Sequence, residues 1–266
     1  MLLNKYTNKV FCCEEIKKNK IAYRVQYADA CISISVGIYV ILILCVNALF
    51  AWRWLIFSKK GCSATKAEPM SIILLDIGNV LVTVDFMRFC RAVAIELNAG
   101  AEEIFRKYCT GELKDKLEIG WIGPLEYLAM IARDPHAKAL PLNMLKHHWQ
   151  NIFEPLEGAV EAVRFLREKH SLWIMSDTDP LHFTFLLNNY SLLRNADQYY
   201  LSFEHGKMKS SVEAFSHVLE SSGRSADEFI LIDDKAENVA SACKAGIRSI
   251  LFQNWPDTLE SLVFCC

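Results

Sequence analysis

The alternation of short apolar runs with amphipathic segments after Met70 is the feature that most limits how this chain can fold. Apolar positions in stretches such as "EGAVEAVRFLREKH" and "SVEAFSHVLESS" recur every three or four residues, which is typical of helices packed on one face. The short runs are apolar on both sides, as in parallel strands covered by helices on both faces. We therefore predict an α/β fold with a doubly covered parallel sheet. Its expected strands are Ile72–Leu75, Leu172–Met175, Tyr199–Leu201, Phe229–Ile232 and Ser249–Phe252.

Polar residues follow four of these expected strands. Asp76 ends the first strand, Ser176 the second and Asp233–Asp234 the fourth, while the loop after the third carries Lys207 and Lys209. In such sheets, ligands bind at the carboxyl ends of the strands. A single residue there is often only a helix cap, but four such positions at one sheet edge predict a site.

This set of residue types suits phosphoryl transfer. Clustered carboxylates repel one another unless a cation neutralises them, and hard oxygen ligands favour Mg²⁺. The hydroxyl of Ser176, the ammonium of Lys209 and backbone N–H groups of the "DIGN" turn can hold a tetrahedral anion. Asp76 can then attack phosphorus, and water can hydrolyse the resulting aspartyl-phosphate.

Four segments, in order, resemble the motifs of the haloacid dehalogenase-like hydrolase superfamily: "LLDIGNVLV", "LWIMSDTDPLH", "SFEHGKMKSS" and "FILIDDKAENVASACKAG". The likeness runs from Met70 to about Phe252. It implies a Rossmann-like sheet and Mg²⁺-dependent hydrolysis of a small phosphorylated metabolite. The catalytic residues that it implies are Asp76 as nucleophile and Lys209. The implied substrate contacts are Gly78, Asn79, Ser176, Asp177 and Lys209, and the implied metal ligands are Asp76, the backbone carbonyl of Gly78, Asp233 and Asp234.

Residues 86–153 are expected to form an inserted helical cap within a domain spanning 70–266. This insertion resembles the helical-cap subgroup, in which the cap closes over the metal and supplies specificity. "DIGNVLV" and "SDTDPLH" look most similar to the bacterial α-D-glucose-1-phosphate phosphatase branch, which implies a sugar 1-phosphate substrate. Candidate substrate contacts in the cap are Arg88, Lys107, Tyr108 and Trp121.

Four positions depart from the superfamily pattern, of which Ser210, where proline commonly follows the lysine, is expected to be a mild change. Gly78 stands where its phosphatases usually carry a second aspartate as general acid and base. Asp177 and Asp179 stand where amides are expected, and they add negative charge near a phosphate site. Two alternatives therefore stay open. Carbon–halogen hydrolysis needs no metal, and the Asp233–Asp234 pair disfavours it; a catalytically impaired, membrane-tethered protein that binds a phosphorylated ligand is the other.

The first quarter of the chain has a different character. Residues 30–52 are 23 uncharged residues between a charged leader, 1–29, and a polar linker, 53–69. As a helix this run would span about 35 Å, enough to cross a bilayer. We expect a single-pass membrane protein with its catalytic domain in the cytoplasm, where Mg²⁺ and phosphorylated metabolites occur. The alternatives are a buried core helix, or translation from Met70, which would give a cytoplasmic protein.

The net charge and the cysteine pattern argue against two further classes of protein, nucleic-acid-binding proteins and zinc ribbons. The net charge of −2 provides no basic field for nucleic acid, so no nucleic-acid partner is expected. The chain has ten cysteines but no C-x-x-C pair, which disfavours a zinc ribbon and indicates a reducing compartment.

Overall fold

The computed structural model describes residues 71–135 and 140–264. The expected leader, apolar run and linker, residues 1–69, lie outside these ranges. None of the helices within the described ranges is long and apolar enough to cross a membrane.

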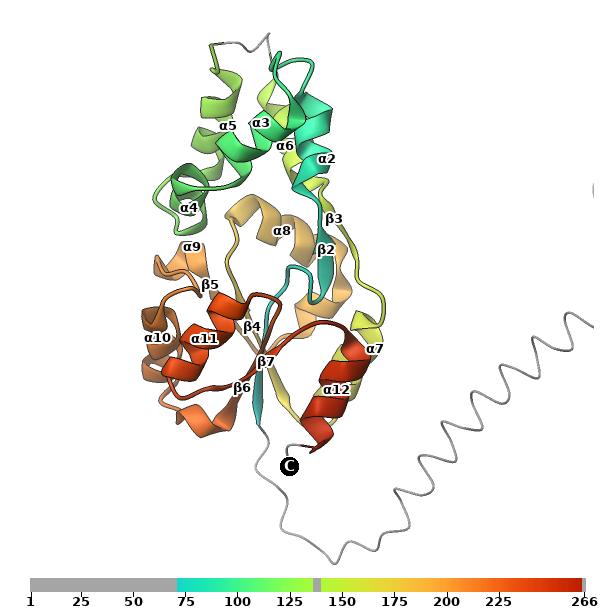
Figure 1. Ribbon diagram of the computed structural model, residues 1–266, viewed down its shortest axis with the longest axis vertical. Helices are drawn as coiled ribbons and strands as arrows, with labels where there is room; N and C mark the ends of the chain where they lie inside the picture. Colours follow the sequence, from blue (N-terminus) through green and yellow to red (C-terminus); the bar gives the residue numbers. More distant parts are fainter. Residues whose placement is uncertain (1–70, 136–139, 265–266) are drawn as a thin grey trace, which may run out of the picture. The chain divides into compact units, whose positions relative to one another are not determined.

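A five-stranded parallel sheet, in the order β5-β4-β1-β6-β7, forms the centre of the described chain (Figure 1). In the central strand β1, Ile72 lies opposite Ser171 of β4 and Phe229 of β6. The predicted α/β fold with a parallel sheet is confirmed, and all five expected strands are present with no end shifted by more than one residue. The strands are β1 (Ile72–Leu75), β4 (Ser171–Ser176), β5 (Gln198–Leu201), β6 (Phe229–Asp233) and β7 (Arg248–Leu251).

Helices cover both faces of the sheet because successive residues of a strand point to opposite sides. Ile73 and Leu75 pack in one core with helices α7, α8 and α12, whereas Ile72 and Leu74 pack in a second core with α10 and α11. The helices of this layer and its short turns are α7 (Ala159–Arg167), α8 (Pro180–Asn189), η2 (Ser191–Asn195), α9 (Ser202–His205), α10 (Val212–Ser222), η3 (Ala226–Glu228), α11 (Ala236–Lys244) and α12 (Trp255–Phe264).

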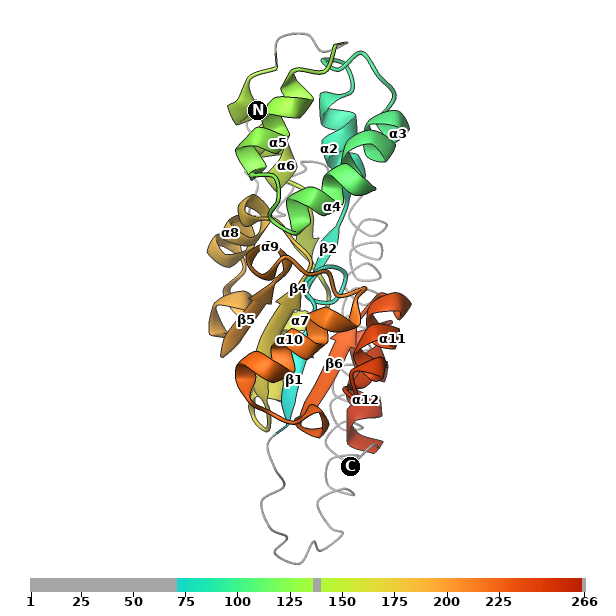
Figure 2. The same ribbon diagram turned by 90° about the vertical axis from the view of Figure 1, so that its left-hand side faces the viewer.

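Two short strands that were not predicted, β2 (Val82–Val84) and β3 (Phe153–Pro155), pair antiparallel and connect the sheet to a separate group of helices. We call this group, residues 86–150, the cap. It lies beyond the carboxyl ends of the central strands (Figures 1 and 2) and has its own core around Phe89, Tyr127 and Trp149. Its helices are α2 (Phe86–Val93), α3 (Ala101–Ile104), the π-helix η1 (Phe105–Cys109), α4 (Glu112–Glu118), α5 (Pro124–Ala132) and α6 (Leu142–Gln150).

Helix α4 is the cap helix that hydrophobic periodicity does not predict. Its sequence, "ELKDKLE", has only two apolar residues, so it lacks a clear apolar stripe. Ion pairs at i,i+4 spacing support it instead: Lys116 contacts Glu112, and Lys114 contacts Glu118. Charge pairing, rather than hydrophobic periodicity, was the signal that could have revealed this helix.

Candidate active site

Asp76 lies directly after β1, where the sheet positions it through its backbone. Its N–H donates to the carbonyl of Ile232 in the neighbouring strand β6. The residue is 5% exposed, and one side-chain oxygen, Oδ1, accepts from the N–H of Ile77 at 2.7 Å and from the Lys209 ammonium at 2.7 Å. The other oxygen, Oδ2, takes no hydrogen bond from the described residues, so one carboxylate oxygen is fixed and the other is available to a ligand.

The turn after Asp76 is tight. The carbonyl of Ile77 accepts from the N–H groups of Leu81 and Val82, and Asn79 adopts a left-handed conformation with φ of 53°. Asparagine tolerates this region better than most residues. The Asn79 amide is used within the protein: Nδ2 donates to Asp234 at 3.1 Å, and Oδ1 accepts from the N–H of Val84. Asn79 therefore ties the first motif to the acidic pair, while the Gly78 N–H donates to no carbonyl of the described chain.

Lys209 occupies the centre of the site. It is 2% exposed, and its ammonium lies 2.7 Å from Asp76 and 2.6 Å from Asp233. Burial opposes the charged form of Lys209, but the two carboxylates outweigh that effect and raise its pKa. Burial raises the pKa of Asp76 to about 7, although Lys209 opposes the change. The site therefore holds more carboxylate charge than one ammonium can neutralise.

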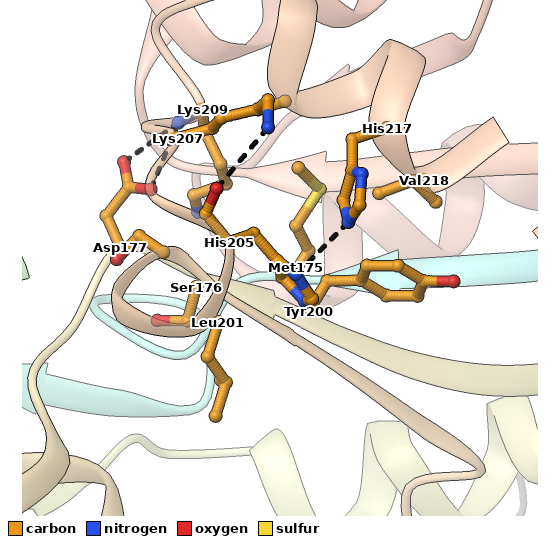
Figure 3. Close-up of a pocket in the computed structure, with 12 residues that line it drawn as sticks. Met175, Ser176, Asp177, Tyr200, Leu201, His205, Lys207, Lys209, His217 and Val218 are labelled. Atoms are coloured by element: carbon orange, nitrogen blue, oxygen red, sulfur yellow. Dashed lines mark hydrogen bonds between the residues drawn. The ribbon is translucent and has the colours of Figure 1, made fainter. Parts of the chain in front are cut away.

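Asp177 holds the loop that carries this lysine. Its two carboxylate oxygens accept from the backbone N–H of Lys209 at 3.0 and 3.3 Å, a contact visible in Figure 3. Burial raises the pKa of Asp177. An amide could offer only one acceptor oxygen here, which gives the carboxylate a structural role beside the site. Ser176, the last residue of β4, is buried next to it.

Asp233 and Asp234 differ in how well their oxygens are satisfied. Asp233 is fully buried and accepts from Lys209, from the N–H of Lys235 and from the amide of Asn238. Asp234 accepts from Asn79 through Oδ2, but its buried Oδ1 has no partner in the described structure. A buried oxygen without a partner is unfavourable unless a cation or a water molecule satisfies it.

Asp76, Asp233 and Asp234 form a candidate metal site. Each offers a carboxylate oxygen, and these oxygens lie within 4.8 Å of one another. Mg²⁺ fits this site better than no cation does, for three reasons. The site offers three hard oxygen donors, it holds an excess of negative charge, and Oδ1 of Asp234 has no other partner among the described residues. The residues present therefore suit the metal that the sequence predicts.

Asp179 does not face this site, so it adds no charge to the phosphate position. It is the N-cap of α8 and accepts from the N–H groups of Leu181 and His182. Its other oxygen accepts from the ring of His182 at 2.8 Å and from the indole of Trp149 in the cap at 3.1 Å. Burial alone would raise the pKa of Asp179, but His182 and these hydrogen bonds lower it to about 2. Asp179 thus joins α8 to cap helix α6.

A cavity of about 190 Å³ opens beside Asp76 between the sheet edge and the cap. The four cap residues expected to contact substrate are elsewhere. Arg88 pairs with Glu154, Lys107 and Tyr108 contact Asp134, and Trp121 is 74% exposed. The cap instead contributes Phe86 and Glu118, which the sequence did not suggest. The cavity is lined by Asp76, Ile77, Gly78, Asn79, Val84, Phe86, Glu118, Phe153, Ser176, Asp177, Thr178, His182, Leu186, Lys209, Asp234 and Lys235.

A second cavity lies behind the lysine loop and shares Ser176, Asp177 and Lys209 with the first. At about 10 Å³ it has room for one water-sized molecule, so it is too small for a substrate. His205 and His217 form its far wall and hydrogen-bond to each other through their rings at 3.1 Å (Figure 3).

The sequence matches the model of the family described as haloacid dehalogenase-like hydrolase over residues 70–246. The chain belongs to this family. The haloacid dehalogenase-like hydrolases are enzymes, and the site described above occupies the matched segment. The superfamily predicted from the four motifs is therefore confirmed.

Solved structures of haloacid dehalogenase-like (HAD) proteins share this fold. The HAD family enzyme bt-2542 from Bacteroides thetaiotaomicron superposes with a TM-score of 0.64 at 22% identity, covering 72% of this chain and 99% of that one. The wild-type bt-2542 complex with magnesium and inorganic phosphate gives 0.62 at 23% identity, covering 71% and 98%. A predicted HAD-like family hydrolase from Porphyromonas gingivalis gives 0.62 at 23% identity, covering 73% and 98%.

Proposed function

We propose that this protein is a Mg²⁺-dependent phosphomonoester hydrolase that acts through an aspartyl-phosphate on Asp76. The observation that carries the proposal is the state of the Asp76 carboxylate. One oxygen is held by Ile77 and Lys209, and the other takes no hydrogen bond from the described residues. A nucleophile needs both a fixed orientation and a free oxygen.

The metal would be held by Asp76, Asp233, Asp234 and the backbone carbonyl of Gly78. When bound, Mg²⁺ would neutralise phosphate oxygens and part of the carboxylate charge. The orphaned oxygen of Asp234 supports this assignment. The bt-2542 complex with magnesium and inorganic phosphate supports it from a protein of the same fold.

The chain's own residues have distinct roles in the proposed reaction. Oδ2 of Asp76 attacks phosphorus, and the bond from phosphorus to the leaving oxygen breaks. Lys209 keeps Asp76 oriented, and its charge offsets that of the phosphate. Ser176 and Gly78 line the cavity, and in the proposed reaction the Ser176 hydroxyl and the Gly78 N–H contact phosphate oxygens. Water then hydrolyses the acyl phosphate, which releases inorganic phosphate and restores the carboxylate.

We assign the protein to the helical-cap subgroup and its substrate to small phosphate esters, with a sugar 1-phosphate as the leading candidate. The cavity of about 190 Å³ suits a small leaving group, and the cap covers the carboxyl ends of the strands. Gly78 cannot donate a proton. Three other carboxylates could replace it as a proton donor. Asp85 caps α2 and Asp179 caps α8. Asp177 lines the cavity, but both of its oxygens accept from the Lys209 N–H. Esters whose leaving oxygen needs little protonation should therefore react best.

A phosphate-ester panel assayed with Mg²⁺ and with a chelator tests this function. We expect hydrolysis of phenyl phosphate, acetyl phosphate and glucose 1-phosphate that is lost on chelation and restored by Mg²⁺. If the metal-loaded protein binds phosphate esters but turns none of them over, the catalytically impaired binding protein is the correct interpretation.

We further propose that residues 30–52 attach the protein to a membrane, with the catalytic domain in the cytoplasm. The uncharged 23-residue run supports this attachment. Full-length protein should resist carbonate extraction from membranes, whereas a chain beginning at Met70 should remain in the supernatant. Release of the full-length chain by carbonate would exclude a membrane-spanning segment.

A further inference from the structure

Glu118, at the end of cap helix α4, is the one carboxylate that the cap contributes to the cavity wall in the described chain. The apolar side chains of Val84, Phe86, Phe153 and Leu186 also line the cavity. The phosphate-binding groups belong to the sheet edge. Glu118 therefore occupies the part of the cavity available to the leaving group.

The carboxylate of Glu118 is oriented by a lysine within the cap. The Lys114 ammonium donates to Oε1 of Glu118, and the two side chains are only 5% and 16% exposed. The same ammonium lies 5.1 Å from the ring centroid of Phe86 and 6.0 Å from that of Trp149. Oε2 of Glu118 takes no hydrogen bond from the described residues. A carboxylate paired in this way is an acceptor with one oxygen to spare.

Contacts with the sheet layer hold Glu118 over the site. Its backbone carbonyl accepts from the Ser202 hydroxyl at 2.6 Å, and the Ser202 oxygen accepts from the N–H of Thr178 at 3.0 Å. Two residues later, Gly120 has φ of +76°, and a Cβ there would lie 2.4 Å from the carbonyl oxygen of Phe203. Only glycine permits this approach, so the end of α4 is seated against α9.

A free carboxylate oxygen in this position selects its ligand by charge and by hydrogen bonding. It repels phosphate, and it loses solvation without compensation when an apolar leaving group covers it. A hydroxyl group on the leaving alcohol would satisfy it. Sites that hydrogen-bond a substrate hydroxyl discriminate strongly against analogues without one.

We propose that Glu118 is a specificity-determining residue that accepts a hydrogen bond from a hydroxyl of the leaving group, so that the enzyme favours phosphate esters of small hydroxylated alcohols. This inference rests on the proposed phosphatase function. Phe86 and Phe153 supply apolar surface for the carbon skeleton of such an alcohol.

The test compares two esters that differ in hydroxyl content, glucose 1-phosphate and phenyl phosphate. The measured quantity is the ratio of their kcat/KM values. In a Lys114→Met/Glu118→Ala variant, which leaves no unpaired buried charge, we expect this ratio to fall by about 10- to 100-fold, the range for a hydrogen bond to a charged group. Glu118→Gln, which keeps an acceptor oxygen, should give a kcat/KM ratio between those of the wild type and the double variant. Glu112→Gln is the matched control, because Glu112 pairs with Lys116 on the same helix but is exposed.

A binding arm separates this proposal from the proposed function. In an Asp76→Asn background, calorimetry should show that glucose 1-phosphate loses its affinity advantage over inorganic phosphate when Glu118 is replaced. A kcat/KM ratio within about twofold of wild type in the double variant overturns the role of Glu118 and leaves the phosphatase intact. If no ester is hydrolysed, the proposed phosphatase function is wrong, and the calorimetric comparison still tests the role of Glu118. Equal affinity for both ligands in the Asp76→Asn protein also overturns the role of Glu118.

Discussion

The sheet edge and the cap contribute to the same cavity in different ways. At the sheet edge, Asp76, Ser176 and Asp233 sit at or directly after strand ends, and the β-ladder sets their positions. In the cap, Phe86 and Glu118 come from the first residue of one helix and the last residue of another. Side-chain contacts, rather than a ladder, hold these two. The reaction therefore depends on backbone geometry, and recognition depends on how the cap is seated.

The charges of the two regions differ as well. Around Lys209 the sheet edge gathers Asp76, Asp233 and Asp234, an excess of negative charge that calls for a cation. The cap carboxylate has its own lysine, Lys114. Changes at the sheet edge should accordingly affect catalysis and metal binding, whereas changes in the cap should affect which ester is chosen.

The largest effect should come from Asp76→Asn at the sheet edge. An amide is nearly isosteric but is a poor nucleophile, so turnover should fall by at least about 10³-fold for every ester. The measurement is kcat at saturating Mg²⁺. The control is Asp227→Asn, because Asp227 is exposed and lies far from Asp76 in the sequence. Wild-type turnover in Asp76→Asn would remove the nucleophile assignment.

Gly78→Asp tests whether the sheet edge lacks a proton donor. A Cβ at Gly78 would meet only the Val84 side chain, at 3.3 Å, so the first atom of the new side chain needs only a small shift of Val84. In wild type, kcat/KM should fall steeply as the pKa of the leaving group rises. The variant should flatten this dependence and raise the rate of the poorest leaving groups by about 10²-fold. A flat wild-type profile would show that another residue already acts as the acid.

Asp179→Asn tests the junction between the two regions through stability. The pKa of Asp179 is about 2 in the folded protein, below its ordinary value of 3.8. A carboxyl group whose pKa is lower in the folded than in the unfolded state stabilises the fold at pH values above the unfolded-state pKa. This stabilisation is lost as pH falls from about 4 towards 2. The variant should be less stable by about 2 kcal/mol at pH 7.

Urea unfolding at a series of pH values measures this effect. The difference between wild type and Asp179→Asn should shrink as pH falls below 4. Asp257→Asn, at an exposed position near the C-terminus, serves as the control. A difference that does not change with pH would show that Asp179 contributes through packing alone.

The smallest effect should come from Gly120→Ala in the cap. The added methyl group would clash with the Phe203 carbonyl and lift the end of α4, which carries Glu118. We expect KM for a hydroxylated ester to rise about fivefold with little change in kcat, since the sheet edge is untouched. Gly111→Ala is the matched control, because Gly111 has a similar φ of +75° but a Cβ there meets nothing within 4 Å. An equal loss of kcat would mean that α4 also supports the chemistry.

The sequence predicted the sheet edge far better than the cap, for a physical reason. Strands buried on both faces are apolar throughout, so the polar residues after Leu75 and Ile232 stand out in the sequence. Helix α4 has no such contrast, because charge pairs support it, and the position of Glu118 over the cavity depends on Ser202, which is 84 residues away. The role of Asp179 was also hidden, because its partner Trp149 lies on another helix.

The antiparallel pair β2–β3 makes the cap a replaceable module. Val84 lies opposite Phe153, and the N–H of Asp85 donates to the carbonyl of Ile152, so the chain leaves and re-enters the sheet layer at adjacent points. A two-residue hairpin turn is enough to join two strands in this arrangement. The junction itself would therefore allow another insertion, or a turn, between β2 and β3, although α8 would then lose the hydrogen bond from Trp149 to Asp179. Selectivity in this protein can change by grafting at a single point of the chain.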